Sequence, residues 1–428
     1  MNALISKFIN LALPIFARLA GAAFQFGIFL LIVINLNAEE SANIFAFQLW
    51  SGLASAVGQF GLSVVSLRIS CRTDVDRNRV AVEILAVLML LLVTTTIAGS
   101  LGSALYYGLV AKANGDTIFC FVLMVCGLSG SQITADLYRA TGRNVFSSIA
   151  SVAAPVAGFV VLGFSIYFAG VSTTTLISRL SYATFFCGFL ITTHLAKTSL
   201  SNFEGKLHYQ KIYISAKRKV AVAFNSFKTS TMAFLAMQID QLILSVISSP
   251  RDFSAYVVGA RLAQIVSVVI SSVNPVISTQ IFAKQGKNEV EEAQMLLNRW
   301  AAVLSIFSIF LAILGYFIIP IVREKYLGSQ TEDVISVISY LTLAALFNLA
   351  TGPKGFYLWI SGYDKLVRRL LTQVMLATCI AASSYAVTKN IKLSAALISL
   401  IFISQYVVEM VLMKKHTKIF PFNFKASK

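Results

Sequence analysis

Long apolar runs follow one another along the chain, and short polar connections separate them. A helix of about 20 residues crosses a hydrocarbon core about 30 Å thick, so each run is long enough to span a bilayer. The pattern predicts an all-α integral membrane protein with twelve transmembrane helices. The expected spans are 8–35, 43–66, 81–109, 117–138, 145–169, 173–195, 220–247, 253–283, 299–321, 334–361, 368–388 and 393–413.

Composition agrees with this pattern. Of the 428 residues, 57% are hydrophobic and 12% are charged, whereas soluble domains average about 45–50% and about 25%. The first apolar run follows Lys7, and no small-residue cleavage site ends it, so we expect a spanning helix and not a cleaved signal peptide. The five cysteines show no CxxC or Cys/His spacing, so we expect no disulfide framework, no metal site and no cofactor.

Basic residues alternate between the connections. One set of connections carries 24 of the 35 Lys and Arg residues and the other set carries six. Because positive charge stays on the cytoplasmic side, both termini are expected inside the cell. Anionic lipid headgroups are then the natural partners of the net charge of +17, and nucleic acid is not needed to explain it.

A weak internal repeat divides the chain. A shift of 220 places "YRATGRN" (138–144) on "LWISGYD" (358–364), and a shift of 210 places Arg18 on Lys228. Each half then holds six spans, an even number, so the halves are parallel and enclose a central cleft. The expected parts are a first half at 1–196, a basic linker at 197–219, a second half at 220–414 and a basic tail at 415–428.

Ionisable side chains inside the expected spans are the candidate site. An ionisable side chain in a spanning helix is unfavourable unless it faces the bundle interior or a water-filled cavity. Some of these cations have long stems that could instead reach the headgroups, Lys228, Lys354 and Arg179 among them. The expected substrate-binding cations are Arg18, Arg179, Lys228, Arg261 and Lys354.

One acidic residue, Asp240, lies within the run "MAFLAMQIDQLILSVI" (232–247). Asp240 precedes the turn at 249–252 by about nine residues, and Arg261 follows it by about nine. At 1.5 Å per residue both lie about 13 Å from the turn, so an ion pair is expected between them. Either the pair only fixes helix packing, or substrate or a coupling ion competes for one partner during transport.

No chemistry for an enzyme is visible. The sequence has no GxxxxGK phosphate loop, so ATP is not expected to drive this chain directly. Its three histidines lie at or beyond cytoplasmic helix ends, and the outer connections are short. A catalytic function is therefore not expected.

Several short motifs recur along the chain in a recognisable order. They are "VGQFGL" (57–62), "DLYRATGR" (136–143), "QIDQLIL" followed by "YVVGARLAQIV" (256–266), and "GPKGFYLWISGYDK" (352–365). Together they resemble the polysaccharide flippases of the multidrug/oligosaccharidyl-lipid/polysaccharide exporter superfamily. The resemblance covers nearly the whole chain with loose motifs. The helix count is most similar to O-antigen translocases, since the superfamily's peptidoglycan-precursor flippases usually have two further helices.

The resemblance implies transport by alternating access of an oligosaccharide on undecaprenyl pyrophosphate, for O-antigen or a similar surface polysaccharide. It also implies other polysaccharide-assembly membrane proteins as partners. The five cations suit this substrate, because Arg can bind phosphate oxygens bidentately and Lys can bind them as a point charge. The alternative is a cation-coupled multidrug antiporter of the same fold, for which an acid-rich cavity would be more suitable.

Overall fold

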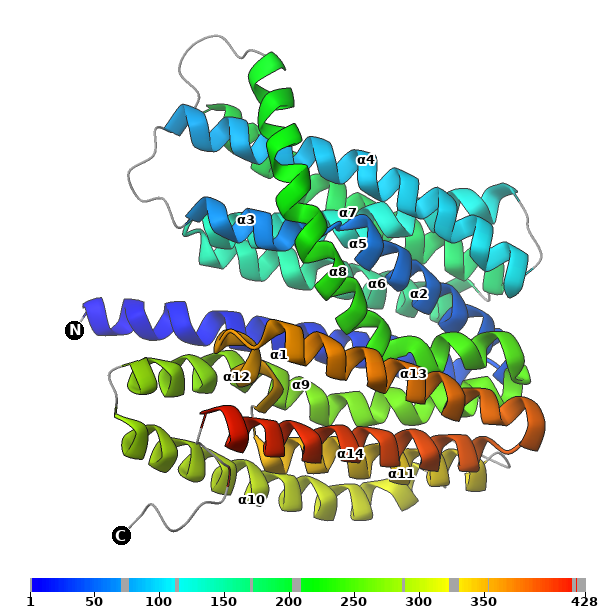
Figure 1. Cartoon of the computed structure of the whole chain (residues 1–428). Helices are drawn as coiled ribbons and strands as arrows, with labels where there is room; N and C mark the ends of the chain where they lie inside the picture. The colour runs from blue at the N-terminus through cyan, green and yellow to red at the C-terminus, as the bar shows by residue number, and fades with distance from the viewer. Residues whose placement is uncertain are drawn as a thin grey trace. The chain divides into compact units, whose positions relative to one another are not determined.

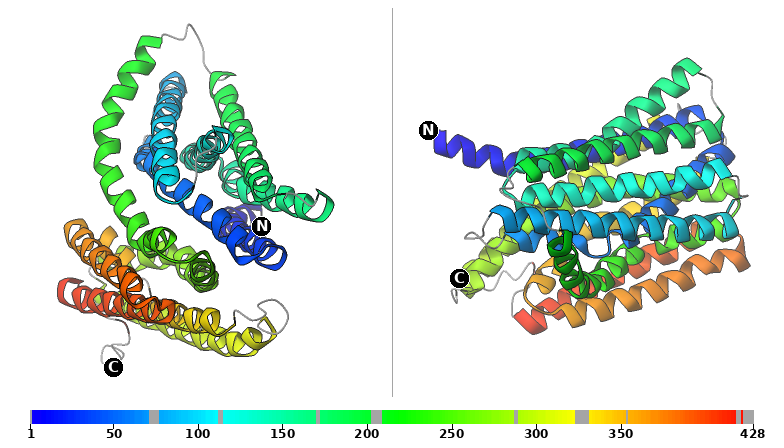
Figure 2. Two further views of the ribbon diagram at one scale, coloured as in Figure 1. Left: turned by 90° about the vertical axis from the view of Figure 1, so that its right-hand side faces the viewer. Right: turned by 90° about the horizontal axis from the view of Figure 1, so that it is seen from above.

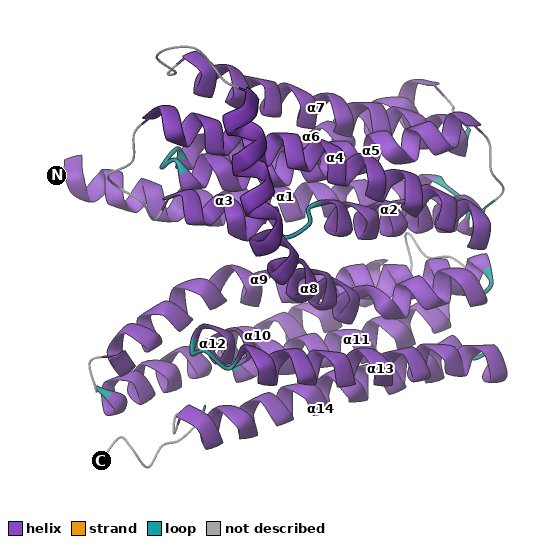
Figure 3. Ribbon diagram, turned by 45° about the horizontal axis from the view of Figure 1, so that its top comes forward, coloured by secondary structure: helices purple, strands orange, loops and turns teal. Residues whose placement is uncertain are grey.

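The computed structural model describes residues 2–70, 77–111, 115–169, 172–201, 209–286, 289–322, 331–352, 354–417 and 421. Every regular element within these residues is an α-helix (Figures 1 and 3). The helices are α1 (Asn2–Asn35), α2 (Ala38–Gly58), α3 (Leu62–Ser70), α4 (Arg77–Leu109), α5 (Gly115–Ala140), α6 (Asn144–Ala169), α7 (Thr173–Ser201), α8 (Tyr209–Ile247), α9 (Pro250–Gly286), α10 (Val290–Val322), α11 (Thr331–Thr351), α12 (Lys354–Ile360), α13 (Asp364–Thr388) and α14 (Ile391–Thr417).

These fourteen helices form the twelve expected spans, because two of the runs contain a break. The run 43–66 is divided into α2 and α3, and the run 334–361 into α11 and α12. By length and hydropathy alone, eight of the described helices qualify as membrane spans, and shorter apolar helices cover Ala20–Asn35 and Phe234–Ile247. The prediction of an all-α membrane protein with twelve spans is confirmed.

The break between α2 and α3 is held in place by α8. Phe60 and Gly61 both have positive φ angles, 48° and 70°. The Phe60 ring lies 5.2 Å from that of Phe227 on α8. A Cβ atom at Gly61 would lie only 2.3 Å from the carbonyl oxygen of Ala223, so the two backbones are in direct contact. Glycine is required here both for its φ angle and for this close approach.

Helix α8 runs across its neighbours in the first part of the chain. Figures 1 and 2 show that its N-terminal turns cross α3 and α4 and do not run alongside them. The chain divides into two compact units, Met1–Leu235 and Ala236–Lys428. The boundary between these two units lies inside α8. The first turns of α8 belong with the first unit.

The turns that end α5 and α12 have the same geometry. Gly142 and Gly362 adopt φ angles of 75° and 88°. The amide of the residue after each glycine donates to the carbonyl five residues before it, Arg143 to Tyr138 at 2.8 Å and Tyr363 to Leu358 at 3.2 Å. This is the pattern that ends a helix with a left-handed glycine. The repeated turn supports the 220-residue shift found in the sequence.

Small residues bring helices together in both units. In the first unit, a Cβ atom at Gly188 of α7 would lie 2.5 Å from the carbonyl oxygen of Gly127 on α5. In the second unit, a Cβ atom at Gly259 of α9 would lie 2.5 Å from Val337 Cγ1 on α11. Close approach at small residues is the usual way in which spanning helices gain packing energy, because lipid tails remove the hydrophobic driving force between helices.

Candidate functional site

The aspartate in the seventh expected span is buried and accepts a hydrogen bond from a tyrosine. Asp240 on α8 and Tyr256 on α9 are 3% and 0% exposed. The Tyr256 hydroxyl donates to Asp240 Oδ2 at 2.5 Å. The expectation of an interior carboxylate is therefore met, and its partner is a neutral phenol in place of a cation.

The expected ion pair between Asp240 and Arg261 is not formed in this structure. The hairpin turns at Ser248 and Ser249, since α8 ends at Ile247 and α9 begins at Pro250. The residue opposite Asp240 is then close to Tyr256, and Arg261 lies five residues, about 7 Å, further along α9. The sequence estimate placed the turn too late. Arg261 is half-buried and donates to Gln264 Oε1 at 3.1 Å, one turn along the same helix.

The turn of this hairpin is fixed to α13. The Tyr385 hydroxyl donates to Asp252 Oδ2 at 2.5 Å, and the Ser249 hydroxyl donates to the same oxygen at 2.9 Å. The Ser249 hydroxyl also accepts from the Asp252 amide at 3.2 Å, so it caps α9, whose first residue is Pro250. The hairpin that carries Asp240 and Tyr256 is thus held at its turn by a third helix.

Lys354 stabilises the break between α11 and α12. Its side chain is buried, with 1% of its surface exposed. The ammonium donates to Asn348 Oδ1 at 2.9 Å, to Thr351 Oγ1 at 2.6 Å and to the Asn348 carbonyl at 3.5 Å. That carbonyl has lost its helical donor, because the Gly352 amide bonds to Leu349 in its place. All three protons of the ammonium therefore have acceptors on α11, and a substrate role for Lys354 would require these bonds to break.

A buried carboxylate, Glu409, also lies near the start of α12. Glu409 on α14 accepts from Gln405 Nε2 at 2.8 Å. A Cβ atom at Gly355 would lie 3.1 Å from both carboxylate oxygens, so Glu409 packs directly on the start of α12. The Lys354 ammonium lies 4.6 Å from the centre of the Tyr406 ring, within cation–π range, and interacts electrostatically with Glu409. Lys354 and Glu409 thus form a compact polar cluster inside the second unit.

The other three expected cations have different surroundings. Arg179 on α7 is half-buried and donates to Ser165 Oγ on α6 at 3.1 Å. Lys228 on α8 is exposed, and its ammonium lies 4.7 Å from the centre of the Phe224 ring. The Arg18 side chain lies outside the described part of the structure. Among the described side chains, the structure therefore places none of the expected cations against another.

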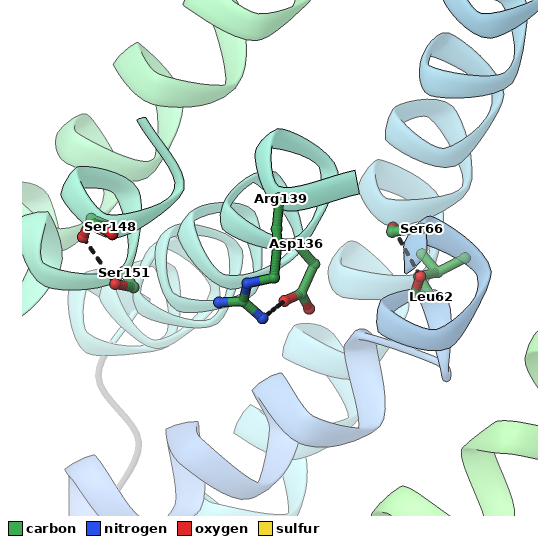
Figure 4. Close-up of polar contacts among 6 residues, drawn as sticks. All are labelled: Leu62, Ser66, Asp136, Arg139, Ser148 and Ser151. Carbon is green, nitrogen blue, oxygen red and sulfur yellow. Dashed lines mark hydrogen bonds and ion pairs between the residues drawn. The ribbon is translucent and has the colours of Figure 1, made fainter. Parts of the chain in front are cut away.

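The "DLYRATGR" motif forms a polar cluster at the end of α5. Asp136 is buried and pairs with Arg139 one turn later at 3.3 Å (Figure 4). The Tyr138 hydroxyl lies 2.6 Å from His194 Nδ1 on α7. These contacts tie the end of α5 to itself and to α7. Among the described residues, no group of three or more His, Cys, Asp or Glu side chains could hold a metal ion.

Sequence reasoning missed Tyr256 and the acceptors of Lys354. Tyr256 could have been found by measuring its distance from the Ser248–Ser249 turn. Asn348 and Thr351 lie in the last turn of α11, and a lysine close to the C-terminal end of a helix can reach back to bond there. The position of Gln405 and Glu409 against α12 is a tertiary contact for which the sequence carries no comparable signal.

Comparison with solved structures finds the same fold in known transporters. An inward-facing multidrug resistance MATE family transporter of the MOP superfamily aligns with a TM-score of 0.66 at 15% identity, covering 96% of this chain and 98% of that one. The MATE multidrug transporter DinF-BH in complex with rhodamine 6G gives 0.66 at 16% identity, covering 96% and 95%.

A third neighbour has a binding pocket described as having reversed polarity. This MOP superfamily transporter from Pyrococcus furiosus gives a TM-score of 0.63 at 13% identity, covering 96% and 95% of the two chains. No protein-family model matches the sequence, and no curated protein matches it. The chain therefore has the twelve-helix fold of the MOP superfamily transporters, and at these identities the similarity shows the fold alone.

Proposed function

We propose that this protein is a secondary transporter that moves an oligosaccharide linked to undecaprenyl pyrophosphate across the bacterial inner membrane, as a flippase for O-antigen or a similar polysaccharide. The fold supports transport, and the charge pattern supports an anionic substrate. Arg18, Arg179, Lys228 and Arg261 are the cations that remain for the pyrophosphate once Lys354 is assigned to the α11–α12 break. Unaided transfer of a pyrophosphate through hydrocarbon would be strongly unfavourable.

The second candidate is a cation-coupled multidrug antiporter. Two observations favour it. Several solved neighbours are multidrug transporters, one of them in complex with rhodamine 6G, and the Asp240 carboxylate is buried within a spanning helix. The known neighbours support this candidate better than the flippase, which rests on the cations and on the resemblance of the sequence motifs.

A transport assay in vesicles separates the two candidates. With the purified protein in lipid vesicles, we expect a fluorescent undecaprenyl-pyrophosphate oligosaccharide to reach the opposite leaflet, measured by quenching from outside, and rhodamine 6G not to be exported. Arg261→Gln should lower this rate by about tenfold or more, because a hydrogen bond to a charged group contributes about 1.5–3 kcal/mol. Lys389→Gln, at an exposed turn, is the matched control. Export of rhodamine 6G without lipid movement would establish the second candidate.

We further propose that Asp240 carries the coupling proton or cation, with Tyr256 as its partner when no ion is bound. In the same vesicles, Asp240→Asn should leave slow transport that no longer responds to an imposed pH or sodium gradient. Tyr256→Phe keeps the carboxylate and should retain the response. An undiminished gradient response in Asp240→Asn would remove the aspartate from coupling.

The orientation in the membrane is a separate prediction. The basic connections place both termini on the cytoplasmic side. In a cysteine-free background, Asn390→Cys should react with an impermeant maleimide added to intact cells, and Ser201→Cys should react only after permeabilisation. Both positions are exposed, so failure to react reports sidedness and not burial. The reverse labelling pattern would overturn the orientation.

A further inference from the structure

The first turns of α8 have one face buried against the protein. Ile212, Ala216 and Ala223 are buried, at spacings of four and seven residues that put them on one side of a helix. Ile212 and Ala216 pack on Ala86 of α4. Lys219 lies on the same side, and its ammonium pairs with Glu83 of α4 at 3.3 Å.

The opposite face combines cations with large apolar side chains. Lys211, Lys217 and Arg218 are exposed. Between them Tyr213 and Ile214 are 59% and 44% exposed. The sequence has no acidic residue from Tyr209 to Leu235, so no acidic side chain in this part of α8 neutralises the three cations.

The position of this face matches the surface of a membrane. These turns of α8 cross α3 and α4 and do not run alongside them (Figures 1 and 2). Their contacts on α4, at Glu83 and Ala86, are within the first three turns of that helix, next to the basic connection that precedes it. A helix that lies across spanning helices near their ends lies along the plane of the bilayer. A charged and aromatic outer face is typical of helices in that position.

We propose that the exposed face of α8 from Lys211 to Phe224 binds the headgroups of anionic phospholipids in the cytoplasmic leaflet. Lys211, Lys217 and Arg218 contact the lipid phosphates, and Tyr213 and Ile214 enter the boundary between headgroups and acyl chains. A basic residue near an anionic surface contributes about fivefold in affinity, so the three together contribute about a hundredfold. This binding is independent of which substrate is transported.

The test compares two triple variants with the same change in charge. Native mass spectrometry of the detergent-purified chain measures binding of phosphatidylglycerol and of phosphatidylcholine with the same acyl chains. The wild type should prefer phosphatidylglycerol. The variant K211Q/K217Q/R218Q should bind it about a hundredfold more weakly and bind phosphatidylcholine unchanged. The control R251Q/K389Q/K392Q removes three cations from connections that are expected on the opposite side of the membrane, and it should stay within about threefold of the wild type.

Three outcomes would overturn the proposal. These are equal loss of phosphatidylglycerol in both triple variants, full retention in the α8 variant, and no lipid preference in the wild type. If the α8 triple variant does not fold, K217Q and R218Q alone are measured, with about a fivefold loss expected for each. Retention of phosphatidylglycerol by both single variants would then equally contradict the proposal.

Discussion

Lys354→Met is expected to leave much less folded protein, with a loss of about 3–5 kcal/mol in the free energy of unfolding, because breaking a buried charge cluster leaves the other charge without compensation. Methionine fills a similar volume and supplies no donor. The Asn348 and Thr351 oxygens and the Glu409 carboxylate would then remain buried with fewer partners. The measurement is the thermal midpoint of the monomer peak in size-exclusion chromatography after detergent extraction.

Two further variants define the cause of this loss. Lys365→Met removes an exposed lysine from α13 and should leave the midpoint unchanged. The double variant Lys354→Met with Glu409→Gln removes the leftover charge and should recover part of the stability. Normal folding of Lys354→Met together with a loss of transport would contradict the structural role and return Lys354 to the substrate-binding cations.

Gly61→Ala is the second variant for which we expect a large effect. Alanine at a φ angle of 70° is unfavourable by about 1–2 kcal/mol. Its Cβ atom would also lie 2.3 Å from the Ala223 carbonyl oxygen and 2.6 Å from the Phe227 amide nitrogen, so α8 must shift. Forcing extra atoms into a packed site costs about 1–3 kcal/mol more. The thermal midpoint of the extracted monomer should fall accordingly.

Gly142→Ala is the matched control for this substitution. Gly142 has a φ angle of 75°, and nothing lies within 4 Å of the position of a Cβ atom there. The control therefore carries the backbone strain without the steric overlap, and its midpoint should fall much less. Equal losses at the two positions would mean that the contact between Gly61 and α8 contributes nothing to stability.

The number of spanning helices could be predicted because the length of an apolar run reports directly on bilayer thickness. Of the two breaks, only the one between α11 and α12 has a signal in the sequence. The Gly-Pro pair in "GPKG" (352–355) indicates a kink in the sequence, whereas Phe60 at positive φ is a conformation that local sequence disfavours and that packing against Phe227 stabilises. The crosswise path of α8 was equally hidden, since its apolar residues continue without interruption into the expected seventh span.

The burial of some ionisable groups could be predicted, but their partners could not. Asp240 and Lys354 are both buried, whereas Lys228 is exposed. Which group bonds to a buried charge depends on turn positions and on contacts between distant helices. Because the sequence estimate placed the α8–α9 turn too late, Arg261 was expected opposite Asp240, where the structure has Tyr256. The three acceptors of Lys354 exist as a set only because α11 ends at Thr351.

The matching turns at Gly142 and Gly362 have a consequence for the origin of the chain. Two six-span segments that share a helix-ending turn are what duplication and fusion of one shorter gene would leave. Because six is an even number, a six-span ancestor would begin and end on the same side of the membrane. The second copy of a tandem duplication would then enter the membrane in the same orientation as the first. The fused gene needed only a linker between the copies, and the basic residues that set the orientation did not have to change sides.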